Sequence, residues 1–440
     1  MLAFLSGLIQ RLRSVPEEQH RHMGHDNGIR KVRSLNNGGL IQASVNIQNQ
    51  TRHAYVTASV SGNGSFRQQI REVLETCRAA LLRADVSCPV VLRQEIFLAD
   101  VGQIEACRQE IADFYGENIP VTTFVPQTPC NGRAALIEVM AVDESAEGQR
   151  RDDRLLVVRH DGVTWVHGAY VKPERSPRTA YDRSYSAFLT MRNMLRRENL
   201  KIGDLVRTWL YQGDIVGPEY DTQRYKELNR ARTDFFEGVT FANGMTPPEY
   251  QGVVYPASTG IGADDSDVVM GFLALDTKRS DVVVVPLENP EQTSAFDYAA
   301  VYSPKSPKFA RAMAVVVGGT TGVIFVSGTA SITGSESRHI DDVQAQTHQT
   351  IDNIQALIDR DNMQRHGIPG LGAGLGDMAV VRAYVKRRGD YEAVRAICEE
   401  RFGPDVPVIY TYADVCRDEL LVEIEGIAFP REYLQRTQLI

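Results

Sequence analysis

Two glutamates near the end of the chain have a type and spacing that indicate chemistry. Glu423 and Glu425 lie in a run in which acidic and apolar residues alternate. Alternate residues of a strand point to opposite faces, so the two carboxyls share one face, and Val422 and Ile424 share the other. A partly buried carboxyl has a raised pKa and can donate a proton in catalysis. The alternative is a strand glutamate that pairs with an arginine at an interface.

A polar, glycine-rich segment at 256–262 (PASTGIG) is a second candidate. Ser258 and Thr259 can donate hydrogen bonds, and Gly260 and Gly262 let a ligand approach the backbone. We therefore expect the segment to line a cleft. A turn with a β-bulge is the alternative.

Other motifs favour structural roles. The loop at 367–376 (GIPGLGAGLG) follows a helix and lacks the lysine of a phosphate-binding loop, so it predicts a long turn. His20, His22 and His25 have no carboxylate or thiol spacing that supports a metal site. The six cysteines are scattered without a CxxC pair, which predicts reduced thiols.

Composition bounds the protein class. The 440 residues carry a net charge of −8, which gives no global basic footprint for nucleic acid. No apolar run reaches the ~18 residues needed to span a bilayer. Residues 1–15 favour a short amphipathic helix, packed on the body or frayed, with membrane contact as the alternative. We expect a cytoplasmic protein with no nucleic-acid or membrane partner.

One order of elements recurs three times, which is typical of tandem repeats. It runs strand, helix, strand, helix, strand, strand, judged from apolar periodicity. In the first repeat these elements fall at 53–60, 66–83, 90–98, 101–115, from 121, and 134–142. In the second they fall at 164–171, 179–198, 204–211, 222–236, 250–263 and 267–275. In the third they fall at 324–331, 341–360, 379–385, 391–402, 408–413 and 420–429.

Each repeat predicts a mixed sheet with helices on one face. The other face must also be buried, and three sheets around a pseudo-threefold axis would bury one another's open faces. The predicted fold class is α/β (α+β), with three tandem units forming a pseudo-trimer in one chain. We predict an N-terminal tail at 1–40 and units at 41–150, 155–285 and 295–440, with an added edge strand at 281–286.

The third repeat resembles the RidA family, also called YjgF or endoribonuclease L-PSP. The resemblance rests on Val326-Ser327-Gly328, the helical run QTHQTIDN at 346–353 and the strand at 421–428. The first repeat has a similar strand end at 136–139. The family fold is chorismate-mutase-like and usually forms a homotrimer with sites between subunits. Three such units in one chain imply a pseudo-trimer.

Residues 155–430 resemble a narrower family, the chorismatases. The motifs PASTGIG at 256–262, SGTAS at 327–331 and ADVCR at 413–417, followed by LVEIEG at 421–426, occur in the right order. Chorismatases hydrolyse the enolpyruvyl ether of chorismate. The resemblance implies a hydrolase that releases pyruvate from a small anionic substrate such as chorismate, without cofactor or metal. It implies that Glu423 protonates the methylene carbon before water attacks the oxocarbenium carbon.

The same resemblance implies the lining of the site. Besides Glu423, the residues expected to contact substrate are Ser258, Thr259, Gly260, Gly328, Ala330 and Cys416. Cys416 lies seven residues before Glu423 and would shape the pocket; no neighbouring histidine supports a nucleophilic role.

The three clefts are expected to differ. Glu138 matches the position of Glu423 in the first unit, whereas the second unit has Val269-Met270-Gly271 there. The third unit alone has both SGTAS and ADVCR, so the cleft of units two and three is the expected active site.

A small dianion requires cationic groups. RidA enzymes hold a carboxylate with an arginine after a proline, but here the matching prolines precede Val408, Ala257 and Gln127. The residues expected to replace that arginine are Arg382 and Lys386 with Tyr384 between them, Arg338 and Arg417.

Alternatives to the hydrolase stay open. They are a RidA-type imine or enamine deaminase, and a ligand-binding or regulatory protein, which the family label of translation initiation inhibitor describes. A ribonuclease is disfavoured because the chain is acidic and lacks a basic-aromatic stripe. Because the sheets close within one chain, we expect a monomer or a dimer.

Overall fold

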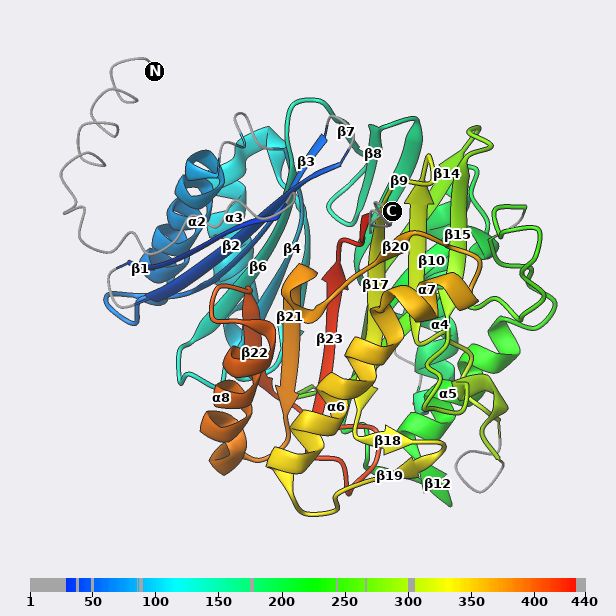
Figure 1. Ribbon diagram of the computed structural model, residues 1–440. Helices are drawn as coiled ribbons and strands as arrows, with labels where there is room; N and C mark the ends of the chain where they lie inside the picture. The colour runs from blue at the N-terminus through cyan, green and yellow to red at the C-terminus, as the bar shows by residue number, and fades with distance from the viewer. Residues whose placement is uncertain are drawn as a thin grey trace, which may run out of the picture.

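Three six-stranded sheets organise the computed structural model, which describes residues 29–36, 39–48, 51–84, 86, 90–174, 178–242, 244–265, 267–299 and 305–432 (Figure 1). The predicted helix at 1–15 and the three histidines that follow it lie outside these residues. No helix among the described residues is long and apolar enough to cross a membrane.

The three sheets have the same strand order relative to the chain. The first runs β1 (Ile29–Asn36), β2 (Gly39–Gln48), β3 (Thr51–Ser59), β6 (Ala135–Val142), β4 (Val90–Leu98) and β5 (Val121–Pro126). The second runs β7 (Glu147–Arg150), β8 (Leu155–His160), β9 (Val163–Val171), β14 (Val268–Thr277), β10 (Leu205–Gly213) and β13 (Ala257–Ala263). The third runs β15 (Val282–Leu287), β16 (Ala312–Val317), β17 (Thr321–Ala330), β23 (Val422–Ala428), β21 (Met378–Val385) and β22 (Val408–Tyr412). The mixed α+β fold is confirmed.

Each sheet has its own helices. They are α2 (Phe66–Arg83) and α3 (Ile104–Tyr115) in the first part, α4 (Ala180–Arg197) and α5 (Arg224–Phe235) in the second, and α6 (Val343–Ile358), α7 (Arg360–Arg365) and α8 (Tyr391–Phe402) in the third. The expected helix at 341–360 ends early because Asp359, in extended conformation, accepts a hydrogen bond from the Asn362 amide and starts α7 instead. Three two-stranded ladders complete the fold: β11 (Pro218–Glu219) with β12 (Thr222–Gln223), β18 (Ile332–Thr333) with β19 (Glu336–Ser337), and β20 (Leu371–Gly372) with β24 (Arg431–Glu432).

Strand pairing moves three segments relative to the expected units. Strand β1, expected within the tail at 1–40, pairs with β2 in the first sheet. Strand β7, placed in unit one, pairs with β8 in the second sheet. Strand β15, placed in the linker and the end of unit two, pairs with β16 in the third sheet. In each case the first strand of a sheet in the chain is an edge strand. The order of elements that recurs three times in the sequence does not include this strand.

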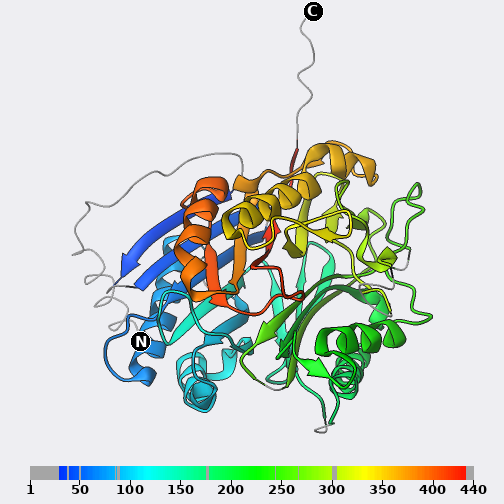
Figure 2. The same ribbon diagram turned by 90° about the horizontal axis from the view of Figure 1, so that it is seen from below.

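The hydrophobic core has one central and three peripheral parts. Three clusters each pack the helices of one sheet against that sheet. A fourth cluster joins the inner faces of all three sheets, through large side chains such as Tyr55, Phe97, Trp165, Trp209, Phe325 and Tyr384. Figure 2 shows the helices at the periphery and the strands toward the middle. Each sheet is thus covered on both faces, by its own helices and by the other sheets.

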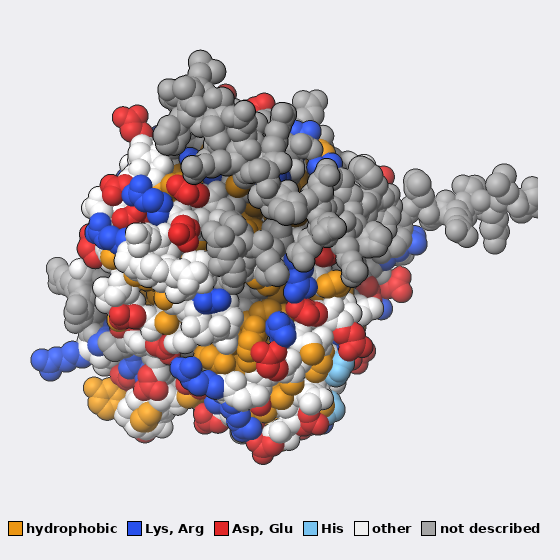
Figure 3. Space-filling model, turned by 90° about the vertical axis from the view of Figure 1, so that its left-hand side faces the viewer, with side chains coloured by type: hydrophobic (Ala, Val, Ile, Leu, Met, Phe, Trp, Pro, Cys, Tyr) orange, Lys and Arg blue, Asp and Glu red, His pale blue; other side chains and the backbone are white. Residues whose placement is uncertain are grey.

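The surface and the thiols fit a chain without disulfide support. On the face shown in Figure 3, Lys and Arg side chains are interspersed with Asp and Glu. The five described cysteines, Cys77, Cys107, Cys130, Cys398 and Cys416, are free, as the scattered spacing predicted.

Candidate active site

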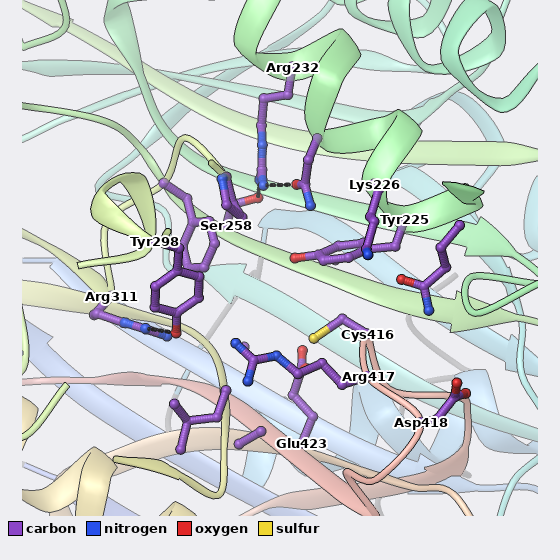
Figure 4. A pocket seen from close by; sticks show the side chains of 18 of the residues that line it. Tyr225, Lys226, Arg232, Ser258, Tyr298, Arg311, Cys416, Arg417, Asp418 and Glu423 are labelled. Carbon is purple, nitrogen blue, oxygen red and sulfur yellow. Dashed lines mark hydrogen bonds between the residues drawn. The ribbon is translucent and has the colours of Figure 1, made fainter. Parts of the chain in front are cut away.

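A cavity of about 250 Å³ lies where the second and third sheets meet (Figure 4). Helix α5 and strand β13 form the wall from the second sheet, and β17, β23 and the loop before β23 form the wall from the third. Its lining includes Tyr225, Lys226, Asn229, Arg232, Ser258, Gly260, Tyr298, Phe309, Arg311, Gly328, Ala330, Cys416, Arg417 and Glu423. Residues 223–260 of the second part and residues 298–423 of the third therefore contribute to one site.

Glu423 is the buried carboxyl of this cavity, which Asp418 and Glu419 also line. It lies near the start of β23 and is only 4% exposed. Burial, and secondarily the negative charge of Glu425, raise its pKa to about 8, although Arg207 and Arg311 act in the opposite direction. The carboxyl is therefore protonated at neutral pH and can donate a proton to a ligand in the cavity.

Gly328 gives the Glu423 carboxyl its space. It lies in a bulge of β17, where the pairing with β23 shifts between Val326 and Thr329. A Cβ atom at residue 328 would lie 2.1 Å from Glu423 Oε1. The glycine of the SGTAS motif is thus required by close packing against the acid.

Two buried arginines supply positive charge at the cavity wall. Arg232 donates from Nη1 to Ser258 Oγ at 3.1 Å and from Nη2 to Asn229 Oδ1 at 2.6 Å. Arg311 donates from Nη2 to the Thr293 carbonyl at 3.0 Å. Both keep an Nε–H without a hydrogen-bond partner among the described residues. Uncharged oxygens orient both guanidinium groups, so their charge is available to an anionic ligand.

Arg232 has the clearest anion-binding character. Ion pairs elsewhere in the described chain are numerous, but none joins Arg232 to a carboxylate, and burial lowers the pKa of its guanidinium. A bound carboxylate would relieve this desolvation. Lys226 and Arg417 add charge from opposite walls, as Figure 4 shows.

Cys416 lines the cavity but is not activated. Desolvation at the cavity wall raises the pKa of its thiol to about 12, so the sulfur stays protonated. This supports the predicted role in shaping the pocket.

The structure brings together most of the predicted lining. Ser258, Gly260, Gly328, Ala330, Cys416 and Glu423 all line the cavity. Thr259 lies directly behind it: its Oγ1 accepts from the Gly328 amide at 2.9 Å and donates to Glu425. The PASTGIG segment is strand β13, so it lines the site and also joins two sheets.

Four predicted residues lie elsewhere, outside the set that lines the cavity. Arg382 and Tyr384 are fully within the central core, Lys386 contacts Asp414 and the Asp418 carbonyl, and Arg338 pairs with Glu336 at the surface. Arg382 and Tyr384 share a strand face with Glu425, and that face points to the central core.

A charged network fills the middle of the molecule. Arg382 binds both oxygens of Glu138 at 2.7 Å, Glu95 at 3.3 Å and Glu425 at 3.2 Å. Arg207 also pairs with Glu425. Burial alone would raise the pKa of Glu425, but Arg207 and Arg382 hold it below its ordinary value. Of the two alternating glutamates, Glu425 is thus the interface ion-pair partner and Glu423 the protonated acid.

Comparison with known proteins identifies the family. No protein-family model matches the chain. A 3-hydroxybenzoate synthase from Streptomyces hygroscopicus is 34% identical over 294 residues, which cover 66% of this chain and 80% of that relative. The chain belongs to the chorismatase family.

Two further chorismatases extend the match. One from Streptomyces rapamycinicus is 36% identical over 225 residues, or 51% of this chain and 63% of that protein. A solved chorismatase structure has a TM-score of 0.59 at 25% identity and covers 77% of this chain and 93% of its own. The chorismatase resemblance is confirmed.

Strand register in this chorismatase-family chain corrects one expectation, the equivalence of Glu138 and Glu423. The central strand of each sheet pairs with its neighbour through a bulge, opposite Ala141, Ala274 or Ala428. Counted from these alanines, Glu138 aligns with Glu425 and with Gly271. The counterparts of Glu423 are Leu136 and Val269. Among the three sheets, only the third carries an acid at this position.

Of the three arginines that line the cavity, the sequence indicated Arg417 but not Arg232 or Arg311. Arg232 lies within the predicted helix, four residues after Leu228 and three before Phe235, on a face that is otherwise apolar. An arginine within an apolar stripe is the signal that could have found it. Arg311 directly precedes the apolar strand β16, where no periodicity distinguishes it from an ordinary boundary residue.

Proposed function

We propose that the chain is an enzyme that cleaves the enolpyruvyl ether of chorismate, with release of pyruvate. The observation that carries the proposal is Glu423, a buried acid with a pKa of about 8 in a cavity that also holds the guanidinium groups of Arg232 and Arg311. The names of the relatives, chorismatase and 3-hydroxybenzoate synthase, support the substrate.

The proposed reaction starts with proton transfer. Glu423 gives its proton to the methylene carbon, and the electron pair of the carbon-carbon double bond forms the new C–H bond. The adjacent carbon becomes an oxocarbenium centre, and the Glu423 carboxylate then accepts a proton from the water that attacks it. The hemiketal then loses the proton of its hydroxyl group and breaks its carbon-oxygen bond to the ring. The ring oxygen takes up a proton, and the products are a ring alcohol and pyruvate.

The cations bind the two carboxylates of the substrate. Arg232 and Arg311 both line the cavity, with Lys226 and Arg417 as further cations. Arg232 comes from the helix α5 of the second part, whereas Glu423 and Arg311 come from the third sheet or directly precede one of its strands, so substrate would bridge the junction between the two parts. Donors that are already fixed in position favour the bound dianion.

A second outcome of the same site is 3-hydroxybenzoate. It is favoured by the relative matched over 80% of its length, which is named for that product. Both reactions release one pyruvate, but the hydrolysis consumes a water and the aromatising route consumes none. Chromatography of the ring product therefore separates the two.

The decisive test is pyruvate release from chorismate by the full-length protein. Glu423→Gln keeps the volume of the side chain but lacks the acid, so the rate should fall ~10²–10⁴-fold with little change in substrate affinity. Glu336→Gln, on the surface ladder β18–β19, is the matched control and should keep the rate. A native protein that neither releases pyruvate nor binds chorismate would refute the proposal; binding without turnover would favour a ligand-binding role.

We also propose that the three sheets stand around a pseudo-threefold axis, as a pseudo-trimer of three units in a cytoplasmic monomer or dimer. The common strand order and the shared central core support this arrangement.

A further inference from the structure

A second, smaller cavity lies at the other end of strand β23 from Glu423. Its volume is about 30 Å³, which is enough for one metal ion but too small for chorismate. It is lined by His53 of β3, by His160 and Asp161 at the turn between β8 and β9, and by Phe429 just after β23. All three sheets thus meet at this point. Strand β23 separates it from the proposed active site by about 20 Å.

Three side chains of this cavity are arranged as metal ligands. Among the described residues, His53, His160 and Asp161 form the group of His, Cys, Asp or Glu residues whose donor atoms all lie within 4.8 Å of one another. His160 Nδ1 and Asp161 Oδ2 share a hydrogen bond of 3.0 Å, and this separation is close to the ~3.3 Å between two ligands of a tetrahedral zinc ion with bonds of about 2.0 Å. The rings of His53 and His160 have centroids 5.0 Å apart.

His53 provides an independent indication of a missing partner. It is only 6% exposed, and its Nε2 has no hydrogen-bond partner among the described residues. A buried polar atom without a partner is costly, and such atoms often mark an ion or a ligand.

We propose that His53, His160 and Asp161 bind one Zn²⁺ ion, with water as the fourth ligand. Two imidazoles and one carboxylate are a donor set that zinc prefers. Since His53 belongs to the first sheet and the other two ligands to the second, the ion would tie these sheets together. The role of the ion would be structural. An ion that binds the folded chain but not the unfolded chain stabilises the folded state, and this ion would lie too far from Glu423 to take part in the proposed reaction.

The first experiment measures zinc binding by the full-length chain after treatment with a chelator. Calorimetric titration with Zn²⁺ should give about one ion per chain, and the ion should raise the melting temperature. Asp161→Asn retains the size and tolerates the positive φ of 52° at this turn, but removes the charged ligand. Zinc affinity should fall at least about tenfold, as it does for perturbed metal sites. His53→Gln should do the same.

Two controls make the result specific. Asp214→Asn makes the same change at another turn aspartate with positive φ, 50°, and should leave zinc affinity and the melting shift unchanged. Joint substitution of His20, His22 and His25 by Gln should also leave them unchanged. The proposal is overturned if the native chain binds no zinc, or if the Asp161→Asn variant binds zinc as tightly as the native chain does. It is also overturned if zinc binding is lost only in the variant with His20, His22 and His25 replaced. Loss in Asp161→Asn and His53→Gln with both controls intact supports it.

Discussion

At the scale of the residue, the two neighbouring glutamates Glu423 and Glu425 differ in protonation state. Glu425 is held ionised by Arg207 and Arg382, while burial and the Glu425 charge keep Glu423 protonated. Separate environments for neighbouring carboxyls are the usual way in which a site assigns its acid. The arginines that set Glu425 therefore also help to set Glu423.

The pH dependence of activity should report Glu423. Because its protonated form is the donor and its pKa is about 8, kcat/KM for pyruvate release should stay high below pH 8 and fall about tenfold per pH unit above it. A profile that rises or stays level through pH 9 would assign the proton donor to another group.

The same carboxyl should affect stability with a defined sign. Its pKa is raised from 4.5 in the unfolded chain to about 8 in the folded one, so the folded state binds more protons between these values. The contribution is fully present below pH 4.5 and is lost as the pH rises through 8. Glu423→Gln has no such group, so its free energy of unfolding relative to the native protein should increase between pH 5 and pH 9. Chemical denaturation at several pH values measures this, and a constant difference would contradict the raised pKa.

At the scale of the element, the bulge in β17 positions the acid on β23. In Gly328→Ala the new Cβ would lie 2.1 Å from Glu423 Oε1 and must displace the carboxyl. A misplacement of about 1 Å can cost ~10²-fold in rate, so we expect a loss of this order with unchanged circular dichroism. Gly389→Ala, at a position with nothing within 4 Å of the new Cβ, should retain full activity. Equal activity of both variants would show that β23 adapts to the change.

The junction of β6, β21 and β23 depends on Arg382. Arg382 forms ion pairs with Glu138, Glu95 and Glu425 in the core, and Arg382→Leu would remove all three of these pairs. Breaking a buried pair in this way costs about 3–5 kcal/mol in the free energy of unfolding. Arg387→Leu breaks an exposed pair with Asp341 and should cost no more than about 1 kcal/mol. Urea unfolding of both variants tests the difference, and similar losses would mean that the network adds no net stability.

At the scale of the whole molecule, the central core closes within one chain. Large apolar side chains of all three sheets meet there, so further copies are not needed to bury the sheet faces. We predict that sedimentation finds one or two chains per particle. An obligate trimer assembled through the sheet faces would contradict this arrangement.

Local patterns in the sequence were sufficient for the elements and for the acid. Helices α2 and α8 begin and end where the apolar periodicity predicted, at 66–83 and 391–402. The alternation in LVEIEG placed both glutamates on one face and Val422 and Ile424 against the helices, because the period of a strand depends on its backbone alone.

Only the tertiary structure decided what each charged group faces. Arg382 and Tyr384, expected to bind substrate, contact Glu425 in the core, while Arg232 and Arg311 lie at the cavity. Strand register, not motif similarity, showed that Glu138 in the first sheet is equivalent in position to Glu425 in the third. The packing of the β8–β9 turn against β3 placed His160 and Asp161 next to His53. The sequence determines which face a side chain takes, since that is local geometry. What lies opposite that face depends on the packing of sheets whose residues are far apart in the chain.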